Sequence, residues 1–172
     1  MGTVTALAVT IPDVSVFQLD EMLGDLEQLG SIESPSNDVE RLTRSAAALA
    51  GLIERRLGGT ATIVESPAGP HVRWSGGGEP VVLLLGHHDT VFPAGTIDQR
   101  PCAVTEGRAT GPGVFDMLAG SVQAIHGIAA RDDRRGVERL FSADEEVGST
   151  HSRPLIEQRA RDMVEHPGGA FR

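Results

Sequence analysis

Two histidines and an aspartate directly follow the most apolar run of the sequence. The stretch LLLGHHDTVFP occupies positions 83–93, with His87, His88 and Asp89 at its centre. Successive side chains of an extended backbone point to opposite sides, so His87 and Asp89 are expected on one side and His88 on the other. A metal-bound imidazole usually has its second nitrogen held by a carboxylate. We therefore predict His87 as a metal ligand and Asp89 as the group that orients it. The alternative is a purely structural His–Asp pair at a strand end.

Carboxylates follow at two further turns or loops. GPGVFD, positions 111–116, ends in Asp116, which is either the N-cap of the next helix or a cation ligand. DEEVGS, positions 144–149, follows an expected strand, and its three adjacent carboxylates repel one another unless water or a cation neutralises them. Because neighbouring side chains generally point different ways, Glu145 and Glu146 can divide two roles. One can ligate a metal while the other takes a proton from water.

Composition narrows the kinds of cofactor and partner. Imidazole and carboxylate ligands without thiolate suit Zn²⁺, Mn²⁺ or Co²⁺. The single cysteine, Cys102, excludes an internal disulfide and a thiolate cluster. With 24 acidic and 15 basic residues the formal net charge is −9, which argues against a nucleic-acid partner. No apolar run reaches the length of a membrane span, and the first residues lack the positive region of a signal peptide. A cytoplasmic protein without a membrane partner is therefore expected.

Periodicity and turn residues predict the elements that must hold these groups. Apolar spacing predicts helices over 18–30 and 38–57, the second capped by Ser36 or Asn37. The runs TATIVESP, GPHVRW and PVVLLLGH are rich in β-branched residues and predict three strands. Positions 81–85 lack polar alternation, so this strand is expected to be central and buried on both faces.

The second half of the chain completes the predicted order. Positions 90–113 are predicted to form a long loop because they contain three prolines and four glycines. A helix then begins at Asp116, VERLFSA forms a further strand, and HSRPLIEQRARDMV forms a closing helix. This order predicts an α/β fold with a mixed central sheet and helices on both faces.

Three blocks of the sequence together resemble a known family. GHHDTVFPAG, GPGVFDM and DEEVGS, in this order, look like the signature blocks of the co-catalytic zinc metallopeptidases. That family includes glutamate carboxypeptidase, acetylornithine deacetylase, succinyl-diaminopimelate desuccinylase and aminoacylase. SPSND and HSRPLIEQRA also resemble it, so the similarity covers roughly residues 18–165 and is closest to the glutamate carboxypeptidase-like branch. The resemblance implies an N-terminal segment, 1–17, and a C-terminally truncated zinc-peptidase catalytic domain, 18–172, without the family's dimerisation domain.

The same resemblance implies a role for each candidate residue. The family holds two zinc ions, for which Co²⁺ or Mn²⁺ can substitute. His87 would ligate one ion, with Asp89 orienting it, Asp116 would bridge both ions, and Glu146 would ligate the other. Glu145 would be the general base, taking a proton from the water that attacks an amide carbonyl. The implied substrate is a small peptide or an N-acyl amino acid.

Departures from the family pattern leave three hypotheses open. The nearest match to a further acidic ligand is Glu165 in MVEHPGGAF, but His166 stands before Pro167. Leu118 replaces the lysine that usually follows the bridging aspartate and methionine, and the family's late histidine has no counterpart up to Arg172. The three hypotheses are a carboxypeptidase or deacylase, an inactive truncated remnant that binds one metal or none, and an aminopeptidase of the related branch.

Overall fold

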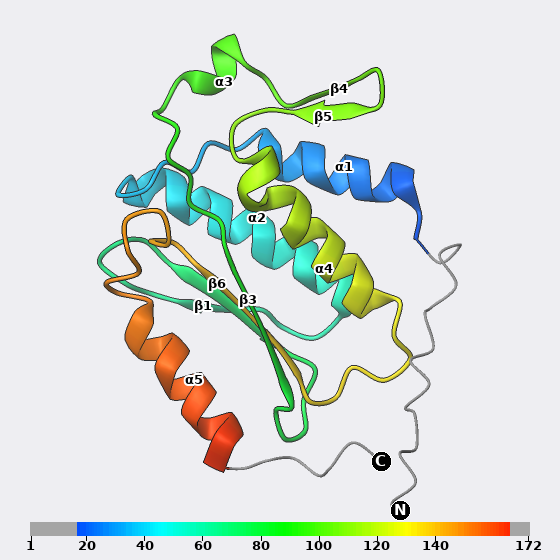
Figure 1. The fold of residues 1–172 in the computed structure, drawn as a ribbon, viewed down its shortest axis with the longest axis vertical. Coiled ribbons are helices and arrows are strands. Elements are labelled where there is room, and N and C mark those ends of the chain that lie inside the picture. Colours follow the sequence, from blue (N-terminus) through cyan, green and yellow to red (C-terminus); the bar gives the residue numbers. More distant parts are fainter. Residues whose placement is uncertain (1–16, 166–172) are drawn as a thin grey trace, which may run out of the picture.

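The computed structural model describes residues 17–165, so the predictions about the N-terminal segment and about His166 fall outside the described part of the chain. The elements are α1 (Leu19–Gly30), α2 (Val39–Leu57), β1 (Thr62–Val64), β2 (His71–Ser75), β3 (Val82–His87), α3 (Thr96–Gln99), β4 (Ala103–Thr105), β5 (Arg108–Thr110), the irregular turn η2 (Val114–Leu118), α4 (Ala119–Ala129), β6 (Val137–Ser142) and α5 (Arg153–Glu165) (Figure 1).

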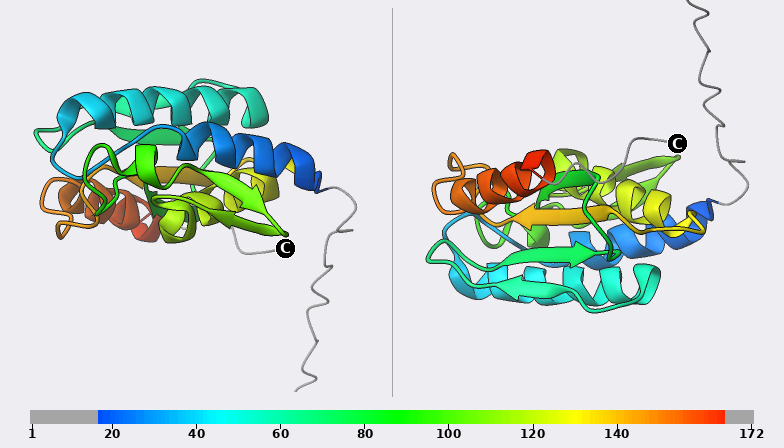
Figure 2. Two further views of the ribbon diagram at one scale, coloured as in Figure 1. Left: turned by 90° about the horizontal axis from the view of Figure 1, so that it is seen from above. Right: turned by 90° about the horizontal axis from the view of Figure 1, so that it is seen from below.

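Four strands form one mixed sheet in the order β1-β2-β6-β3. β1 and β2 pair antiparallel, as do β2 and β6, whereas β3 and β6 run parallel. A parallel pair needs a long crossover, and here it includes α4. Figure 2 shows α1 and α2 on one side of the sheet and α5 on the other. The predicted α/β fold with helices on both faces is confirmed.

The main core lies between the sheet and the helices α1, α2 and α4. Helical spacing puts the apolar side chains of each helix on one face, which packs on the sheet. Its central members come from α2 (Leu49, Leu52 and Ile53), from α4 (Val122 and Ile125) and from the sheet (Val72 and Phe141). None of the helices within the described residues is long and apolar enough to cross a membrane.

A buried ion-pair network attaches α5 to the opposite face of the sheet. Glu138 of β6 accepts hydrogen bonds from Arg159 of α5 at 2.8 and 3.0 Å and from Arg73 of β2 at 2.9 Å. Because a buried carboxylate is stable only when it is paired, this arrangement favours one placement of α5. The start of α5 in turn limits the course of loop 143–152, which carries Glu145 and Glu146.

The cap of α2 differs from the prediction. Asp38 caps the helix by accepting a hydrogen bond from the Arg41 backbone at 3.1 Å. The Ser36 hydroxyl instead donates to Asp89, and Asn37 adopts a left-handed backbone conformation with φ 69°. The tertiary contact of Ser36 therefore outweighs its local capping preference.

The predicted loop 90–113 contains regular structure. α3 forms its middle, and β4 and β5 pair as a short antiparallel hairpin. Glu106 and Gly107 at the turn have positive φ values of 52° and 75°. That backbone suits a two-residue hairpin turn. The two strands are only three residues each, too short for alternation to reveal them.

The prediction of a central, doubly buried strand at 81–85 is wrong. β3 lies at the edge of the sheet, where Val82 is 38% and Leu85 46% exposed. The interior strands are β2 and β6, and Leu140 and Phe141 of β6 are fully buried. An apolar run shows that a strand has two apolar faces, but it does not determine how many strands pair with it. An apolar hollow of about 520 Å³, lined by residues that include Leu84 and Ile128, lies between β3 and α4.

This exposed edge generates the first testable prediction. An unpaired apolar strand edge is a template for association between chains. We expect the purified chain to elute from a sizing column above monomer mass, in a concentration-dependent way. Leu85→Lys should shift elution toward the monomer because a charged side chain blocks edge pairing. A sharp monomeric profile of the unaltered chain would contradict this.

Arg139 is an unusual charged residue within the core. Alternation along β6 puts it on the same face as Val137 and Phe141, which belong to the main core. It is 2% exposed, and its Nε and Nη2 have no hydrogen-bond partner within the described residues. Nη1 lies 3.4 Å from the Leu85 carbonyl oxygen, and the guanidinium lies 4.2 Å from the Phe141 ring centroid. Burial lowers the pKa of Arg139 to about 10.

Replacing this group should stabilise the fold. Arg139→Met keeps an unbranched side chain and removes a poorly paired buried charge, so we expect the free energy of unfolding to rise by about 1–3 kcal/mol. Urea unfolding followed by circular dichroism measures the change. Arg159→Met is the matched control and should destabilise, because it deprives buried Glu138 of a partner. A lower urea midpoint for Arg139→Met would show that the guanidinium supports the core.

Candidate metal centre

The site lies at the edge of the sheet where β3 and β6 end. The parallel register places His87, the last residue of β3, beside Ser142, the last residue of β6. The connections that leave the two strands therefore meet at one rim, where ligands of open α/β sheets usually bind. His87 comes from the strand end, and Glu145 and Glu146 come from loop 143–152. Asp116 comes from η2 after the hairpin.

Three predicted ligands form one cluster within the described residues. One ligand atom each from His87, Asp116 and Glu146 lie within 4.8 Å of one another. His87 Nε2 is 3.1 Å from Asp116 Oδ1 and 3.8 Å from Glu145 Oε2. An imidazole nitrogen with carboxylate oxygens is a donor set that fits Zn²⁺. Glu145 is beside this cluster, near enough to act on a water bound there.

Asp89 is the buried centre of the rim. Its carboxylate accepts hydrogen bonds from the Ser36 hydroxyl at 2.8 Å and from the Glu145 and Glu146 backbone N–H groups at 3.2 Å. Its Oδ1 also lies 3.4 Å from His87 Nδ1. Burial opposes ionisation, but these contacts hold the pKa of Asp89 below its usual value. A charged Asp89 therefore connects His87 to the loop that carries the glutamates.

The backbone of Asp89 contributes as well as its carboxylate. His87 Nδ1 lies 2.9 Å from the Asp89 carbonyl oxygen, to which it donates. This bond leaves Nε2 as the ring nitrogen that faces Asp116. Orientation of His87 by Asp89, which we expected through the carboxylate alone, thus involves the main-chain oxygen at the shorter distance.

The local charge favours a cation. Burial would lower the pKa of His87, but hydrogen bonds to Asp89 and Asp116 raise it to about 9. Burial raises the pKa of Glu146 above its usual value. The positive charge of His87 opposes that rise, while Asp116 and Asp89 add to it. Several carboxylates thus converge on one imidazole, and a positive charge among them relieves their repulsion.

Asp116 does not cap a helix, in contrast to one reading of its sequence. It lies inside η2 with extended angles of φ −124° and ψ 99°, and α4 begins only at Ala119. Its side chain is 70% exposed and is directed toward His87 Nε2. The N-cap position of α4 is Leu118, with no side-chain cap hydrogen bond, so the Asp116 carboxylate is left to face the rim.

His88 points away from the cluster. Its Nε2 donates to the Pro70 carbonyl oxygen at 3.0 Å, and its Nδ1 accepts from the Ser45 hydroxyl at 3.0 Å. Burial lowers the pKa of His88 to about 4, so the ring is neutral near pH 7. The expected division between His87 and His88 agrees with these contacts.

The backbone of Glu165 lies far from the loop that carries Glu145 and Glu146. It is the last residue of α5, a helix of 13 residues that begins just after loop 143–152. At a rise of about 1.5 Å per residue, its backbone lies roughly 20 Å along the helix from that loop. Figure 1 shows α5 running away from the loop. The Glu165 side chain lies outside the described part of the chain, so its assignment stays a prediction.

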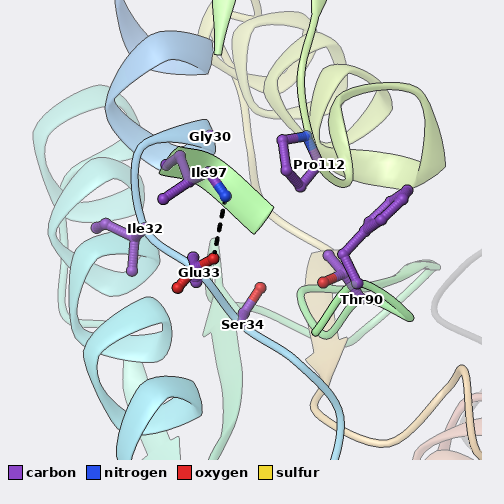
Figure 3. Close-up of a pocket in the computed structure, with 8 residues that line it drawn as sticks. Gly30, Ile32, Glu33, Ser34, Thr90, Ile97 and Pro112 are labelled. Atoms are coloured by element: carbon purple, nitrogen blue, oxygen red, sulfur yellow. Dashed lines mark hydrogen bonds between the residues drawn. The ribbon is translucent and has the colours of Figure 1, made fainter. Parts of the chain in front are cut away.

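The segment after α1, residues 31–36, is hydrogen-bonded to the chain that follows β3. The sequence analysis did not predict these contacts. The Thr90 N–H donates to the Ser34 carbonyl at 2.8 Å, and the Ser36 N–H donates to the Thr90 carbonyl at 3.0 Å. Glu33 accepts from the Ile97 N–H at 3.2 Å (Figure 3). The cavity between these segments is only about 10 Å³, room for about one water. The SPS stretch was the available signal, although it was interpreted as a helix cap.

Comparisons with known proteins agree with this geometry. The model of peptidase family M20/M25/M40 matches residues 83–171. Carboxypeptidase G2 of Pseudomonas sp. (strain RS-16) is 31% identical over 146 residues, which cover 79% of this chain and 35% of that protein.

Two solved structures share the fold. The M20 family metallo-carboxypeptidase Sso-CP2 from Sulfolobus solfataricus has a TM-score of 0.66 at 22% identity, over 83% of this chain and 35% of that one. The dipeptidase Dug1p from Saccharomyces cerevisiae has a TM-score of 0.63 at 19% identity, over 83% of this chain and 36% of that one. The chain thus spans about a third of the length of these relatives.

The family model covers more than half of the chain and includes the HHD, GPGVFD and DEE blocks. The resemblance to the zinc metallopeptidases, on the glutamate carboxypeptidase-like side, is therefore confirmed. The chain belongs to peptidase family M20/M25/M40.

Proposed function

We propose that the chain is the metal-binding part of a hydrolase that cleaves amide bonds of small peptides or N-acyl amino acids. The observation that carries this proposal is the convergence of His87, Asp116 and Glu146 with Glu145 beside them. Family membership supports the reaction class, and the 31% identical relative is named a carboxypeptidase.

The donor atoms suggest which residues would hold a metal. His87 Nε2, an Asp116 oxygen and a Glu146 oxygen would bind Zn²⁺, with Co²⁺ or Mn²⁺ as substitutes. Asp116 is the residue proposed to bridge to a second ion. When bound, the metal would lower the pKa of a water and polarise the amide carbonyl.

Side chains of the protein would position the metal ligands and transfer the proton. Asp89 holds His87 and both glutamate backbones in place. Glu145, with a side chain 54% exposed at the rim, would accept a proton from the attacking water at a carboxylate oxygen. The same carboxyl would then give that proton to the leaving amine. Glu145 is suited to this role because its carboxylate lies beside the ligand cluster and outside it.

A second candidate is a chain that binds one metal without turnover. Within the described residues a single group of three ligands was found, enough to hold one ion. Two-metal hydrolysis requires that both ions be held. The match covers only about a third of each relative, so the lid, dimerisation and second-ion functions of a whole enzyme stay proposals for this chain.

Zinc stoichiometry tests the metal site. After chelation and reloading, elemental analysis should find at least one tightly held zinc per chain. Asp116→Ala and His87→Ala should each abolish tight binding because each removes a ligand. Asp98→Ala, which removes an exposed carboxylate from α3, is the matched control and should bind as before. Two zincs per chain would support the hydrolase, and one would support the second candidate. Unchanged zinc in Asp116→Ala would refute its role.

Glu145→Gln tests the general base. The amide keeps the shape of the side chain but cannot accept the proton, so hydrolysis should fall by roughly 10²–10⁴-fold. Zinc content should stay that of the unaltered chain. The assay pairs an N-acyl amino acid with a dipeptide that has a free amino terminus. Preference for the free terminus would favour the aminopeptidase alternative, and full activity of the variant would exclude Glu145 as the base.

A further inference from the structure

A second set of buried polar groups lies at loop 143–152, the loop that carries Glu145 and Glu146. His71 at the start of β2 and Asp144 are each 1% exposed, and Ser152, just before α5, is fully buried. Within the described residues, His71 Nε2, Asp144 Oδ1 and Ser152 Oγ have no hydrogen-bond partner. Buried polar atoms are nearly always paired, with protein or with ordered water, so three unpaired atoms at one loop require an explanation.

His71 is joined directly to the chain that leaves β6. The Ala143 N–H donates to His71 Nδ1 at 3.1 Å. Since Nδ1 accepts this bond, the proton of the neutral ring is on Nε2, the unpaired atom. Burial lowers the pKa of His71, which keeps the ring neutral and preserves this arrangement. Asp144 is the charge that acts most strongly on the ring.

Asp144 connects the same loop to α5. Its Oδ2 accepts from the His151 N–H at 2.7 Å and from the Ser152 N–H at 3.2 Å, and its carbonyl accepts from Ser149 at 2.7 Å. Both ends of loop 143–152 are therefore held at Asp144. Its second oxygen, Oδ1, needs a donor, and His71 Nε2–H is a donor that needs an acceptor.

We propose that His71 is a positioning residue: with Asp144 and Ser152 it holds one buried water that fixes the loop presenting Glu145 and Glu146. A water here accepts from His71 Nε2–H, donates to Asp144 Oδ1 and uses its remaining bond for the Ser152 hydroxyl. Three partners are the usual number for a buried water. The inference rests on the proposed function for its catalytic meaning, because the loop matters to hydrolysis only if its glutamates do.

The position of His71 explains why the site needs it. Asp89 holds the Glu145 and Glu146 backbones on the side facing the metal cluster. The His71–Asp144 group holds the preceding and following residues from the side of α5. The exposed loop is thus fixed from two directions, which limits the movement of both glutamate side chains relative to His87.

Variants of His71 separate its two bonds. An Asn oxygen can stand where Nδ1 does, so His71→Asn keeps an acceptor for the Ala143 N–H but has no group at the Nε2 position. His71→Leu removes both bonds. Ser152→Ala removes only the third partner of the water. His126→Gln is the matched control, because His126 is also a buried histidine with a carboxylate partner, Asp25, but lies in α4.

Two measurements test these variants. Amide hydrogen exchange is measured in the metal-free chain, and the affinity for Co²⁺ is measured by visible absorption. In His71→Asn the His151 and Ser152 amides should exchange roughly tenfold faster, with Ala143 still protected. In His71→Leu all three should exchange faster. Co²⁺ should bind about 10–100-fold more weakly to both variants, the usual effect of losing a group that supports metal ligands. Ser152→Ala should show a smaller change in the same direction, and it serves if His71→Leu does not fold.

Two results would overturn the proposal. One is unchanged exchange across loop 143–152 in folded His71→Asn and Ser152→Ala. The other is the same acceleration in His126→Gln, which would indicate general destabilisation. If the unaltered chain binds neither zinc nor cobalt, the proposed function fails, while the exchange comparison still decides whether His71 positions the loop.

Discussion

The rim of the sheet depends on one buried anion, the carboxylate of Asp89. A charge removed from water must be fully hydrogen-bonded, and Asp89 meets this requirement with partners from two distant segments. Ser36 follows α1, and the Glu145 and Glu146 amides follow β6. If either segment moves, the carboxylate loses a partner in a site where loss is costly. The stability of the rim and the geometry of the candidate metal ligands therefore have the same cause.

The parallel pairing of β3 with β6 brings His87, Asp89 and the glutamate loop to the same edge of the sheet. Parallel neighbours end at the same side of a sheet, so His87 and the loop after Ser142 emerge together. The same pairing uses only one edge of β3, and its other edge carries exposed apolar side chains. The chain matches about a third of the length of its relatives. The unpaired edge of β3 and the cluster of His87, Asp116 and Glu146 both lie within the third of those proteins that this chain matches.

Local rules predicted some features well. Helical spacing located α1 and α2 to within a residue or two, because an amphipathic helix is determined by its own neighbours along the chain. Alternation in an extended chain separated His87 from His88 for the same reason. Alternation failed for the three-residue strands β4 and β5, which are too short to show a period. The capping rule failed for Asp116 because an irregular turn lies between it and Leu118, the N-cap position of α4.

The sequence by itself determined the residue types at the rim, their order and the helices that flank them. Imidazole and carboxylates without thiolates limit the chemistry whatever the fold. Only the tertiary structure decided that β3 is an edge strand, that Ser36 meets Asp89 rather than capping α2, and that His71 supports the backbone at Ala143. These contacts join residues 53 and 72 positions apart. They depend on strand order and register, and a local pattern cannot encode them because periodicity reports only how each segment faces its immediate surroundings.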